Sequence, residues 1–459
     1  MGDIFNPCDI RGHATEQLSP ELFARFGLAL GKMLAPGDTI VVGADRRASS
    51  PAFRAALIDG LRRAPVHIVD LRTVPTPLVY FAKRHLNAAA CAMVTASHNP
   101  PEDNGLKWLI GRDPPNAEQV AQLKAVSEDE SKAPPFATDE EPKTRCLQKE
   151  YIAALQERWH SATLNLRIVV DPMHGCWSRL GRVCLHAVFP QLMIEAIHDR
   201  PSPTFEGLSP DPSNPANIRE LAETVERERA SLGFAFDGDG DRMALVDEYG
   251  TILSAEETAW CFLKTFGEEL QGKKFVHDVK FSDRLATHVK TLDGTPCMSK
   301  TGHAFVRRVM YEQEAIFGAE VSGHFYFGEI EAADDGVFAA CRILDYLGRT
   351  GLSLSDLREE CPPLYLTSDL RVGASEAVID AVMLKMETYR PSRKRDMADG
   401  VRIRFEDGFL LARRSGTEPK VTFRFEAGSP EALKERVRQF CDDFPDIGDD
   451  LWERYLNSF

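Results

Sequence analysis

The chain has 459 residues, of which 43% are hydrophobic and 27% charged, and its formal net charge is −15. This length predicts several domains, because single hydrophobic cores stop growing beyond about 250–300 residues. The acidic balance argues against nucleic acid and anionic membranes as the main partners, since both bind basic surfaces.

The start of the chain, Met1 to Pro7, lacks the basic region and apolar core of a signal peptide. No long apolar segment without charges occurs, so no membrane span is expected. The ten cysteines are scattered without a Cys-x-x-Cys pair, which is typical of reduced thiols in cytosolic proteins. We therefore expect a cytoplasmic protein.

The first third of the chain alternates apolar runs with amphipathic stretches. A helix is predicted from Pro20, with Ser19 as its N-cap. Short apolar runs predict strands over residues 39–43, 66–71 and 88–94. Strands that alternate with helices form mostly parallel sheets, so we expect an α/β domain. The polar, proline-containing stretch 127–144 is expected to form a surface loop that leads out of it.

The remaining chain continues this alternation and then changes character. Two further α/β units are predicted from strands over residues 166–170 and 232–236, and over 274–279 and 315–319. Beyond Pro362 and Pro363, a small antiparallel sheet is predicted, with a closing helix after Ser429. Its strands are expected over residues 401–405, 408–412 and 421–426. The sequence thus predicts three α/β units and an α+β tail.

Ser97 lies in a break, Thr95 to Pro100, that follows the third predicted strand. Loops at the carboxyl ends of strands in α/β sheets are where ligands usually bind. We expect Ser97 to be presented at this edge rather than buried, with His98 beside it and Lys107 ten residues further on. Taken alone, a serine in such a turn is more often a plain turn residue than a nucleophile.

Three carboxylates, Asp237, Asp239 and Asp241, alternate with glycines after the apolar run 233–236. Carboxylates this close repel one another unless a cation neutralises them. Hard oxygen ligands with room for a phosphate oxygen suit Mg²⁺. The pattern predicts a magnesium site, with a solvated acidic turn as the plain alternative.

Two other kinds of site share part of this acidic pattern. A calcium EF-hand loop would use the same three aspartates with Glu248, but Arg242 stands where that loop needs glycine, and the flanks resemble strands. A phosphatase of the haloacid-dehalogenase type would use the first aspartate as a nucleophile and Asp334 with Asp335 as a late acidic pair. That alternative leaves the loop around Ser97 unexplained.

Two later loops also carry ligand-binding groups. Glu320, Ser322 and His324 place a carboxylate, a hydroxyl and an imidazole in one turn, which suits vicinal sugar hydroxyls. The turn from Arg413 to Lys420 combines a guanidinium, hydroxyls and glycine amides, which together can bind phosphate. The plain alternatives are a glycine-rich loop with a satisfied glutamate and a hairpin turn with solvated charges.

The run Thr95-Ala96-Ser97-His98-Asn99-Pro100 resembles the active-serine loop of the α-D-phosphohexomutases, the phosphomannomutase/phosphoglucomutase superfamily. The acidic run and the two later loops resemble three further loops of that family in the same order. The resemblance implies three similar α/β domains with mixed sheets and a C-terminal α+β domain around a central active-site cleft. The expected domains carry the phosphoserine, metal, sugar and phosphate loops, respectively: 1–145, 146–250, 251–361 and 362–459.

The resemblance implies an enzyme that interconverts hexose 6-phosphate and hexose 1-phosphate, of mannose or glucose, through a hexose 1,6-bisphosphate. Ser97 would carry the phosphoryl group, and Mg²⁺ would be held by the phosphoserine together with the three aspartates. Arg11, Lys107 and Arg242 would stabilise the transferring charge. Lys107 and His324 are the candidates for general acid and base.

The binding residues that the resemblance implies lie mostly in the later loops. For the sugar and its non-reacting phosphate they are Lys300, His303, Glu320, Ser322, Arg413, Ser415, Gly416 and Thr417. Cys8 replaces a tyrosine that is frequent in bacterial relatives, and Val321 replaces the usual methionine or glutamine, so a glucosamine phosphate stays open as substrate. A pseudoenzyme that only binds phosphosugars is the remaining alternative. We expect a phosphosugar ligand and a monomer or homodimer.

Overall fold

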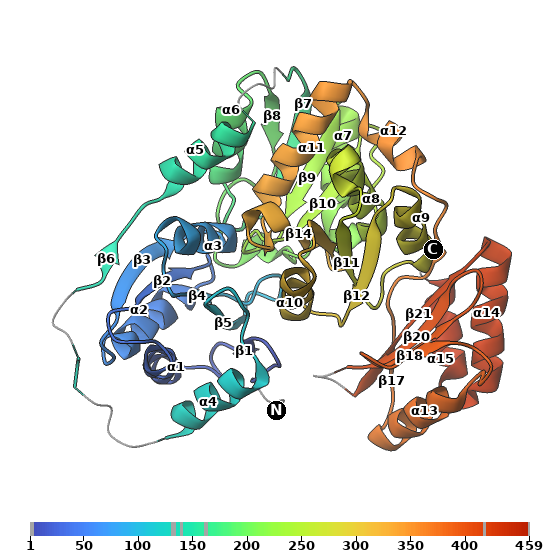
Figure 1. The fold of residues 1–459 in the computed structure, drawn as a ribbon, viewed down its shortest axis with the longest axis horizontal. Coiled ribbons are helices and arrows are strands. Elements are labelled where there is room, and N and C mark those ends of the chain that lie inside the picture. Colours follow the sequence, from blue (N-terminus) through green and yellow to red (C-terminus); the bar gives the residue numbers. More distant parts are fainter. Residues whose placement is uncertain (1–3, 130–134, 138–140, 160–163, 416–418, 458–459) are drawn as a thin grey trace. The chain divides into compact units, whose positions relative to one another are not determined.

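The computed structural model describes residues 4–129, 135–137, 141–159, 164–415 and 419–457 (Figure 1). The chain divides into two compact units. The larger unit contains Ile4–Thr265 and Ser322–Arg358, and the smaller unit contains Phe266–Val321 and the chain from Glu359 onward. Every helix of the described residues is too short or too polar to span a bilayer.

The first sheet of the larger unit has six strands in the order β1-β5-β4-β2-β3-β6. Neighbours from β4 to β6 run parallel, whereas β5 is antiparallel to β4 and to β1. The strands are β1 (Ile10–His13), β2 (Thr39–Ala44), β3 (His67–Thr73), β4 (Ala90–Val94), β5 (Asp103–Ile110) and β6 (Lys143–Thr144). The three predicted strands are confirmed. The loop predicted over 127–144 is wrong at both ends, because residues 127 and 128 belong to a helix and Lys143 and Thr144 pair with β3. Residues 130–134 and 138–140 of this predicted loop lie outside the described residues.

The helices beside this sheet are α1 (Pro20–Lys32), α2 (Ser50–Leu61), α3 (Thr76–His85) and α4 (Ala117–Glu128). Ser19 caps α1 as predicted, since its hydroxyl accepts a hydrogen bond from the backbone of Leu22 at 3.2 Å. Helices α1 and α2 meet at two glycines. A Cβ on Gly27 would lie 2.0 Å from a carbonyl of α2, and a Cβ on Gly60 would lie 1.9 Å from a carbonyl of α1. The two helices therefore pack backbone to backbone.

The second sheet of the larger unit has the order β10-β9-β7-β8, with β10 antiparallel to β9 and the other pairs parallel. Its strands are β7 (Arg167–Asp171), β8 (Met193–Ala196), β9 (Leu232–Phe236) and β10 (Met243–Asp247). The unit also contains α5 (Gln148–Arg158), α6 (Leu180–Val188), η1 (Phe205–Gly207), η2 (Pro215–Ile218), α7 (Arg219–Arg227), α8 (Ala255–Phe266), β14 (Phe325–Phe327), η4 (Gly328–Ile330), β15 (Ala333–Asp334), α11 (Gly336–Thr350) and α12 (Leu354–Glu359).

The smaller unit contains a parallel arrangement of β12, β11 and β13, and an antiparallel sheet in the order β16-β21-β20-β19-β18, with β17 also paired to β21. Its parallel part consists of η3 (Gly267–Leu270), β11 (Lys274–Asp278), α9 (Asp283–Thr291), β12 (Thr295–Ser299), α10 (His303–Gln313) and β13 (Phe317–Ala319). The antiparallel part consists of β16 (Tyr365–Leu366), β17 (Leu370–Gly373), α13 (Glu376–Thr388), β18 (Arg395–Asp396), β19 (Val401–Arg404), β20 (Phe409–Arg414), β21 (Lys420–Ala427), α14 (Pro430–Asp443) and α15 (Pro445–Leu456).

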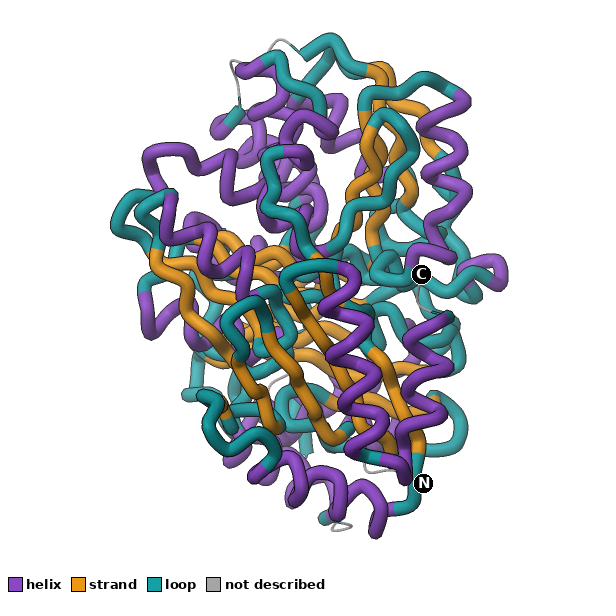
Figure 2. Tube along the Cα trace, turned by 90° about the vertical axis from the view of Figure 1, so that its right-hand side faces the viewer, coloured by secondary structure: helices purple, strands orange, loops and turns teal. Residues whose placement is uncertain are grey.

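The C-terminal sheet shares one apolar core with its helices, to which Phe423 of β21, Val437 of α14 and Leu451 of α15 contribute. Figure 2 shows the sheets as groups of orange strands with purple helices alongside. The predicted fold class, α/β domains with mixed sheets followed by an antiparallel α+β domain, is confirmed.

Candidate functional site

Ser97 lies just beyond the end of β4, as predicted, but it is buried rather than presented. Its hydroxyl donates to Asp237 Oδ2 at 2.7 Å, and its backbone N–H donates to Thr95 Oγ1 at 2.8 Å. His98 Nδ1 lies 3.4 Å from the same hydroxyl oxygen. The prediction of a presented serine is wrong because the serine loop packs against the acidic loop that follows β9.

The backbone of Ser97 is left-handed, with φ of 53°. This conformation is uncommon for a residue other than glycine, and at a buried site its surroundings must hold it. Here the fully buried Arg47 donates from Nη2 to the carbonyls of Ser97 and Asn99, both at 2.7 Å, and from Nη1 to that of Pro100. Arg47 Nε donates a hydrogen bond to Asp45 Oδ2 at 3.0 Å. One guanidinium thus shapes the whole serine loop.

Sequence reasoning missed Arg47, although Asp45 and Arg47 follow β2 at the same sheet edge as Ser97. We predict that Arg47→Leu destabilises the fold by about 3–5 kcal/mol, because it leaves the Asp45 carboxylate buried without its partner. Turnover should fall in parallel. Thermal melts and rate measurements check this, with Arg349→Leu as control, since that arginine forms an exposed pair with Asp345. If Arg47→Leu had the melting temperature and the turnover rate of the wild type, other contacts would hold the loop.

The three aspartates are buried just beyond β9, and one carboxylate oxygen from each gathers within 4.8 Å of the others. Burial raises the pKa of Asp237 well above its usual range, and the neighbouring carboxylates of Asp239 and Asp241 raise it further. Among the described residues, no hydrogen-bond donor contacts Asp239 Oδ1. The same holds for Asp241 Oδ1. A buried set of hard oxygens, two of them without a donor, fits a divalent cation such as Mg²⁺.

The two glycines between the aspartates allow close approaches of the backbone. A Cβ on Gly238 would lie 2.7 Å from the carbonyl oxygen of Ser97. Gly240 has φ of 83°, and a Cβ there would lie 2.3 Å from Trp177 Nε1. Trp177 Nε1 donates to the Gly240 carbonyl at 2.8 Å, and the backbone N–H of Gly336 donates to it at 3.3 Å. The acidic loop is therefore fixed on both sides.

Lys107 is buried against the acidic cluster. Its ammonium donates to Asp239 Oδ2 at 3.0 Å and to Asp241 Oδ2 at 2.7 Å, and Thr76 Oγ1 also donates to Asp239 Oδ2 at 2.7 Å. Burial lowers the pKa of Lys107, but the two carboxylates outweigh it and raise the pKa above its usual value. In this arrangement Lys107 is protonated, so it can neutralise charge or donate a proton but cannot accept one.

Arg11 reaches the serine loop from β1, where it lies opposite Gly105 of β5. Its Nε donates to Asp9 Oδ2 at 2.9 Å, and its Nη1 donates to the Ala96 carbonyl and to Asn99 Oδ1, the latter at 3.3 Å. Strand pairing therefore brings this arginine to the residues on either side of Ser97, although it lies 85 residues before Ala96 in the sequence.

Arg242 and His324 close the other side of the acidic cluster. The backbone N–H of Arg242 donates to Asp237 Oδ1 at 3.1 Å, and its Nε donates to His324 Nε2 at 3.3 Å. The same imidazole nitrogen lies 3.5 Å from Asp241 Oδ1, and Nδ1 lies 2.9 Å from Ser322 Oγ. The larger unit thus gathers a serine, three carboxylates, three cationic side chains and an imidazole in one buried cluster.

The remaining predicted residues of the sugar and phosphate loops lie in the smaller unit. Glu320 Oε1 accepts from the backbone N–H of Gly302 at 2.7 Å. Asp399 Oδ2 accepts from the backbone of Thr301 at 3.0 Å and from Arg413 Nε at 2.8 Å. Sequence reasoning missed Asp399, since nothing in its polar turn distinguishes it, yet it joins the two loops predicted to bind sugar and phosphate.

The other predicted binding residues of these two loops are five. Lys300 is exposed, with its Nζ 5.8 Å from the centre of the Phe305 ring, and His303 begins α10. The backbone N–H of Ser415 donates to the Lys420 carbonyl at 2.9 Å. Gly416 and Thr417 lie outside the described residues.

Comparison with known families matches four models to the chain, in order. Three are described as phosphoglucomutase/phosphomannomutase α/β/α domains I, II and III, and they match residues 2–132, 149–250 and 255–365. The fourth, the phosphoglucomutase/phosphomannomutase C-terminal domain, matches residues 371–443.

Individual relatives match over nearly the full length. The chain is 32% identical over 449 residues to a phosphomannomutase/phosphoglucomutase of Pseudomonas aeruginosa, covering 95% of this chain and 94% of the relative. It is 31% identical over 457 residues to a Methanopyrus kandleri protein named "Probable phosphoglucosamine mutase", covering 97% and 98%. The crystal structure of a phosphoglucomutase/phosphomannomutase family protein from Burkholderia thailandensis matches with a TM-score of 0.85 at 30% identity, covering 99% and 98%.

Proposed function

Because the chain belongs to the phosphoglucomutase/phosphomannomutase family and is a phosphohexomutase, an intramolecular phosphotransferase, we propose that it converts mannose and glucose phosphates through a phosphoserine at Ser97. One observation carries the proposal. The Ser97 hydroxyl lies 2.7 Å from Asp237, inside a buried cluster of carboxylates and cations. The Lys300-Thr301-Gly302-His303 loop supports mannose and glucose over the amino sugar.

The proposed reaction transfers a phosphoryl group from Ser97 to the sugar and then returns a phosphoryl group from the sugar to Ser97. The bond from phosphorus to Ser97 Oγ breaks, a bond to the free sugar hydroxyl forms, and the hydroxyl proton passes to a base. The product of this step is a hexose 1,6-bisphosphate. After the sugar has reversed, its other phosphoryl group returns to Ser97 Oγ and the proton returns to the sugar oxygen. The serine ends the cycle phosphorylated, so the hexose is isomerised without net consumption of phosphate.

The surrounding charges support this chemistry. Arg11, Lys107 and Arg242 are proposed to stabilise the negative charge on the transferring group, since cations fixed in a buried site do so without reorganising. His324 is the proposed base, because Lys107 is protonated in this arrangement and cannot accept the sugar proton. The three aspartates and the phosphoserine would hold Mg²⁺, which supplies further neutralisation of the phosphoryl charge when bound.

Arg413, Ser415, Gly416 and Thr417 are proposed to bind the phosphate that does not react, while Glu320 and Ser322 bind sugar hydroxyls. A guanidinium with hydroxyls recognises phosphate rather than sugar, so it accepts either end of the bisphosphate. This property matters because the intermediate must turn around before the second transfer.

Arg413→Ala is therefore predicted to raise the Michaelis constant and the demand for added hexose 1,6-bisphosphate. The lost charge-assisted hydrogen bonds are worth about 1.5–3 kcal/mol, or roughly ten- to a hundred-fold in affinity. Bisphosphate that escapes leaves Ser97 unphosphorylated, so excess bisphosphate should rescue turnover. Arg414→Ala is the matched control, because the neighbouring arginine pairs with exposed Glu376 and Asp380. A raised Michaelis constant with an unchanged bisphosphate requirement would make Arg413 a substrate anchor only.

The substrate is tested by turnover of the 1-phosphates of mannose, glucose and glucosamine side by side, with Mg²⁺ and hexose 1,6-bisphosphate present. We expect mannose and glucose to be preferred. Equal or higher efficiency with glucosamine 1-phosphate would instead indicate a phosphoglucosamine mutase. Phosphosugar binding without any turnover would indicate the pseudoenzyme alternative.

A further inference from the structure

Asp399 lies in the turn between β18 and β19 and contacts both predicted binding loops of the smaller unit. Its Oδ2 accepts one hydrogen bond from the Thr301 backbone N–H at 3.0 Å and another from Arg413 Nε at 2.8 Å. The exposed fractions are 17% for the Asp399 side chain and 29% for that of Arg413, so this ion pair is screened less than a pair at the surface. Because both donors share one oxygen, displacement of one donor disturbs the hydrogen bond of the other.

The place of Asp399 beside Arg413 follows from the backbone. Val401 pairs with Ala412, so the turn before β19 reaches the end of β20. Gly400 has φ of 85°, and a Cβ on it would lie 2.4 Å from the Ala412 carbonyl oxygen and 2.9 Å from the Cα of Arg413. Only glycine allows this close approach. The fold therefore holds the carboxylate against the guanidinium before any ligand binds.

The loop of residues 300–303 is bound by two carboxylates. Asp399 accepts from the backbone N–H of Thr301. Glu320 Oε1 accepts from the backbone N–H of the next residue, Gly302, at 2.7 Å. Both amides lie immediately before the first turn of α10. Removal of the Asp399 carboxylate would leave the loop bound by the second carboxylate only.

We propose that Asp399 is a positioning residue that couples phosphate binding at Arg413 to sugar selection by the loop of residues 300–303. This role rests on the proposed function, in which Arg413 binds the non-reacting phosphate and this loop favours mannose and glucose over glucosamine. The ion pair with Asp399 is formed by Nε, so Nη1 and Nη2 can form the paired hydrogen bonds that phosphate accepts. A guanidinium that is oriented in advance loses less conformational freedom on binding. One carboxylate thus sets the direction of the phosphate-binding group and the position of the sugar loop together.

The test compares Asp399→Ala, Arg413→Ala and the variant with both changes. Asp399→Ala should raise the Michaelis constant for glucose 1-phosphate and the bisphosphate requirement about tenfold, while kcat at saturating bisphosphate stays near that of the wild type. In the double variant, the change at Asp399 should add no further rise to that of Arg413→Ala, because Asp399 acts on phosphate through this guanidinium. Additive effects of the two changes would overturn the coupling.

Sugar selection gives a second readout, which a loss of phosphate binding alone would not change. The ratio of kcat/KM for glucose 1-phosphate to that for glucosamine 1-phosphate should fall at least about threefold in Asp399→Ala, because the Thr301 amide loses its acceptor. It should stay unchanged in Arg413→Ala. Asp399→Asn separates the two contacts, since its amide oxygen can still accept from Thr301 but carries no charge for the guanidinium. This variant should keep the ratio while the Michaelis constant rises. An unchanged ratio in Asp399→Ala would overturn the link to the sugar loop.

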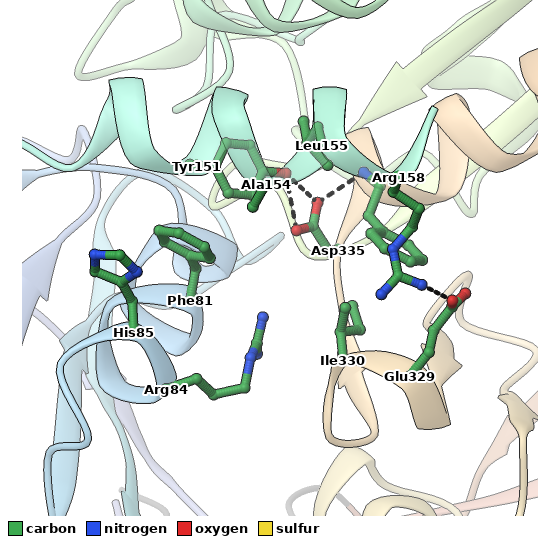
Figure 3. Close-up of a pocket in the computed structure, with 11 residues that line it drawn as sticks. Phe81, Arg84, His85, Tyr151, Ala154, Leu155, Arg158, Glu329, Ile330 and Asp335 are labelled. Atoms are coloured by element: carbon green, nitrogen blue, oxygen red, sulfur yellow. Dashed lines mark hydrogen bonds and ion pairs between the residues drawn. The ribbon is translucent and has the colours of Figure 1, made fainter. Parts of the chain in front are cut away.

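Glu329→Ala is the matched control. It removes a carboxylate that pairs with Arg158 in the larger unit, where the exposed fractions are 28% for Glu329 and 36% for Arg158 (Figure 3). This variant should have the Michaelis constant, the bisphosphate requirement and the sugar ratio of the wild type. Wild-type behaviour of Asp399→Ala next to an impaired Arg413→Ala would overturn the inference and leave the proposed phosphate loop standing. Wild-type behaviour of Arg413→Ala would instead refute the phosphate loop itself, and the coupling with it.

Discussion

Replacing Ser97 with alanine is expected to abolish mutase turnover, a loss on the order of 10⁴-fold or more, as for other enzymes that lose a covalent nucleophile. Alanine offers no oxygen to which phosphorus can bond. The neighbouring His98 cannot replace Ser97 as the nucleophile. Its Nδ1 lies 3.4 Å from the position of the serine oxygen, and the fixed loop does not let it move there. Mass spectrometry of active wild-type protein should find the phosphoryl group on Ser97 and nowhere else in the loop.

The stability of Ser97→Ala should fall modestly. The lost hydroxyl leaves one hydrogen bond of buried Asp237 unmade, which costs about 1–3 kcal/mol. The fold should survive, so loss of turnover would report on chemistry. Ser127→Ala is the matched control, because that buried serine donates only to the Lys124 carbonyl in α4 and should leave turnover intact. Normal turnover in Ser97→Ala would refute the phosphoserine mechanism.

Removal of divalent metal is expected to have the second largest effect. Chelation should stop turnover and Mg²⁺ should restore it, because the three buried carboxylates and a phosphoserine together carry more negative charge than the nearby cations neutralise. Asp239→Asn should weaken metal binding by at least about 10–100-fold. Calorimetric titration with Mg²⁺ measures this without relying on turnover.

Asp345→Asn serves as control for Asp239→Asn, since Asp345 pairs with the exposed Arg349 on α11 and does not belong to the acidic cluster. It should bind Mg²⁺ and turn over as wild type does. If calcium bound tightly and chelation spared turnover, the acidic loop would be an EF-hand-like calcium site and its proposed catalytic role would be wrong.

Much of the candidate site could be predicted because its signals are local. Ser97, the three aspartates and Arg413 each follow or end a strand, and the strand pattern with its turn residues is readable within about ten positions. The N-cap at Ser19 could be predicted for the same reason, since its hydrogen-bond partner Leu22 lies three residues further along the chain. Such features depend on neighbours in sequence, which is the information that a single chain displays.

The burial of Ser97 was not predictable in this way. It depends on Asp237, 140 residues further along the chain, and on the glycine beside it that lets the two loops touch. The same holds for Arg47, whose carbonyl partners lie about 50 residues away, and for Asp399, which links two loops about 100 residues apart. Periodicity tells which face of an element is apolar, but it does not tell which distant loop will meet it.

Short strands escaped prediction for another reason. β6 has two residues and β1 has four, too few for an alternating pattern to stand out from chance. Both are edge strands whose existence depends on a partner strand already in place. Their positions follow from the completed sheet rather than from their own residues.

The edge position of β1 makes Arg11 the most weakly secured of the charged groups around Ser97. Among the described strands, β1 has β5 as its one neighbour, and its other side is bonded by the short segment around Ile4 and Phe5, while β4 and β5, which frame the serine loop, have strands on both sides. Such an edge can open by local unfolding at a much lower free energy than the whole domain. The backbone amides of β1 should then exchange with solvent well before those of β4. A protein in which β1 has detached would have the melting temperature and the light scattering of the native protein, yet Arg11 would be missing from the charges around the phosphoryl group. An affinity tag is therefore better placed at the C-terminus.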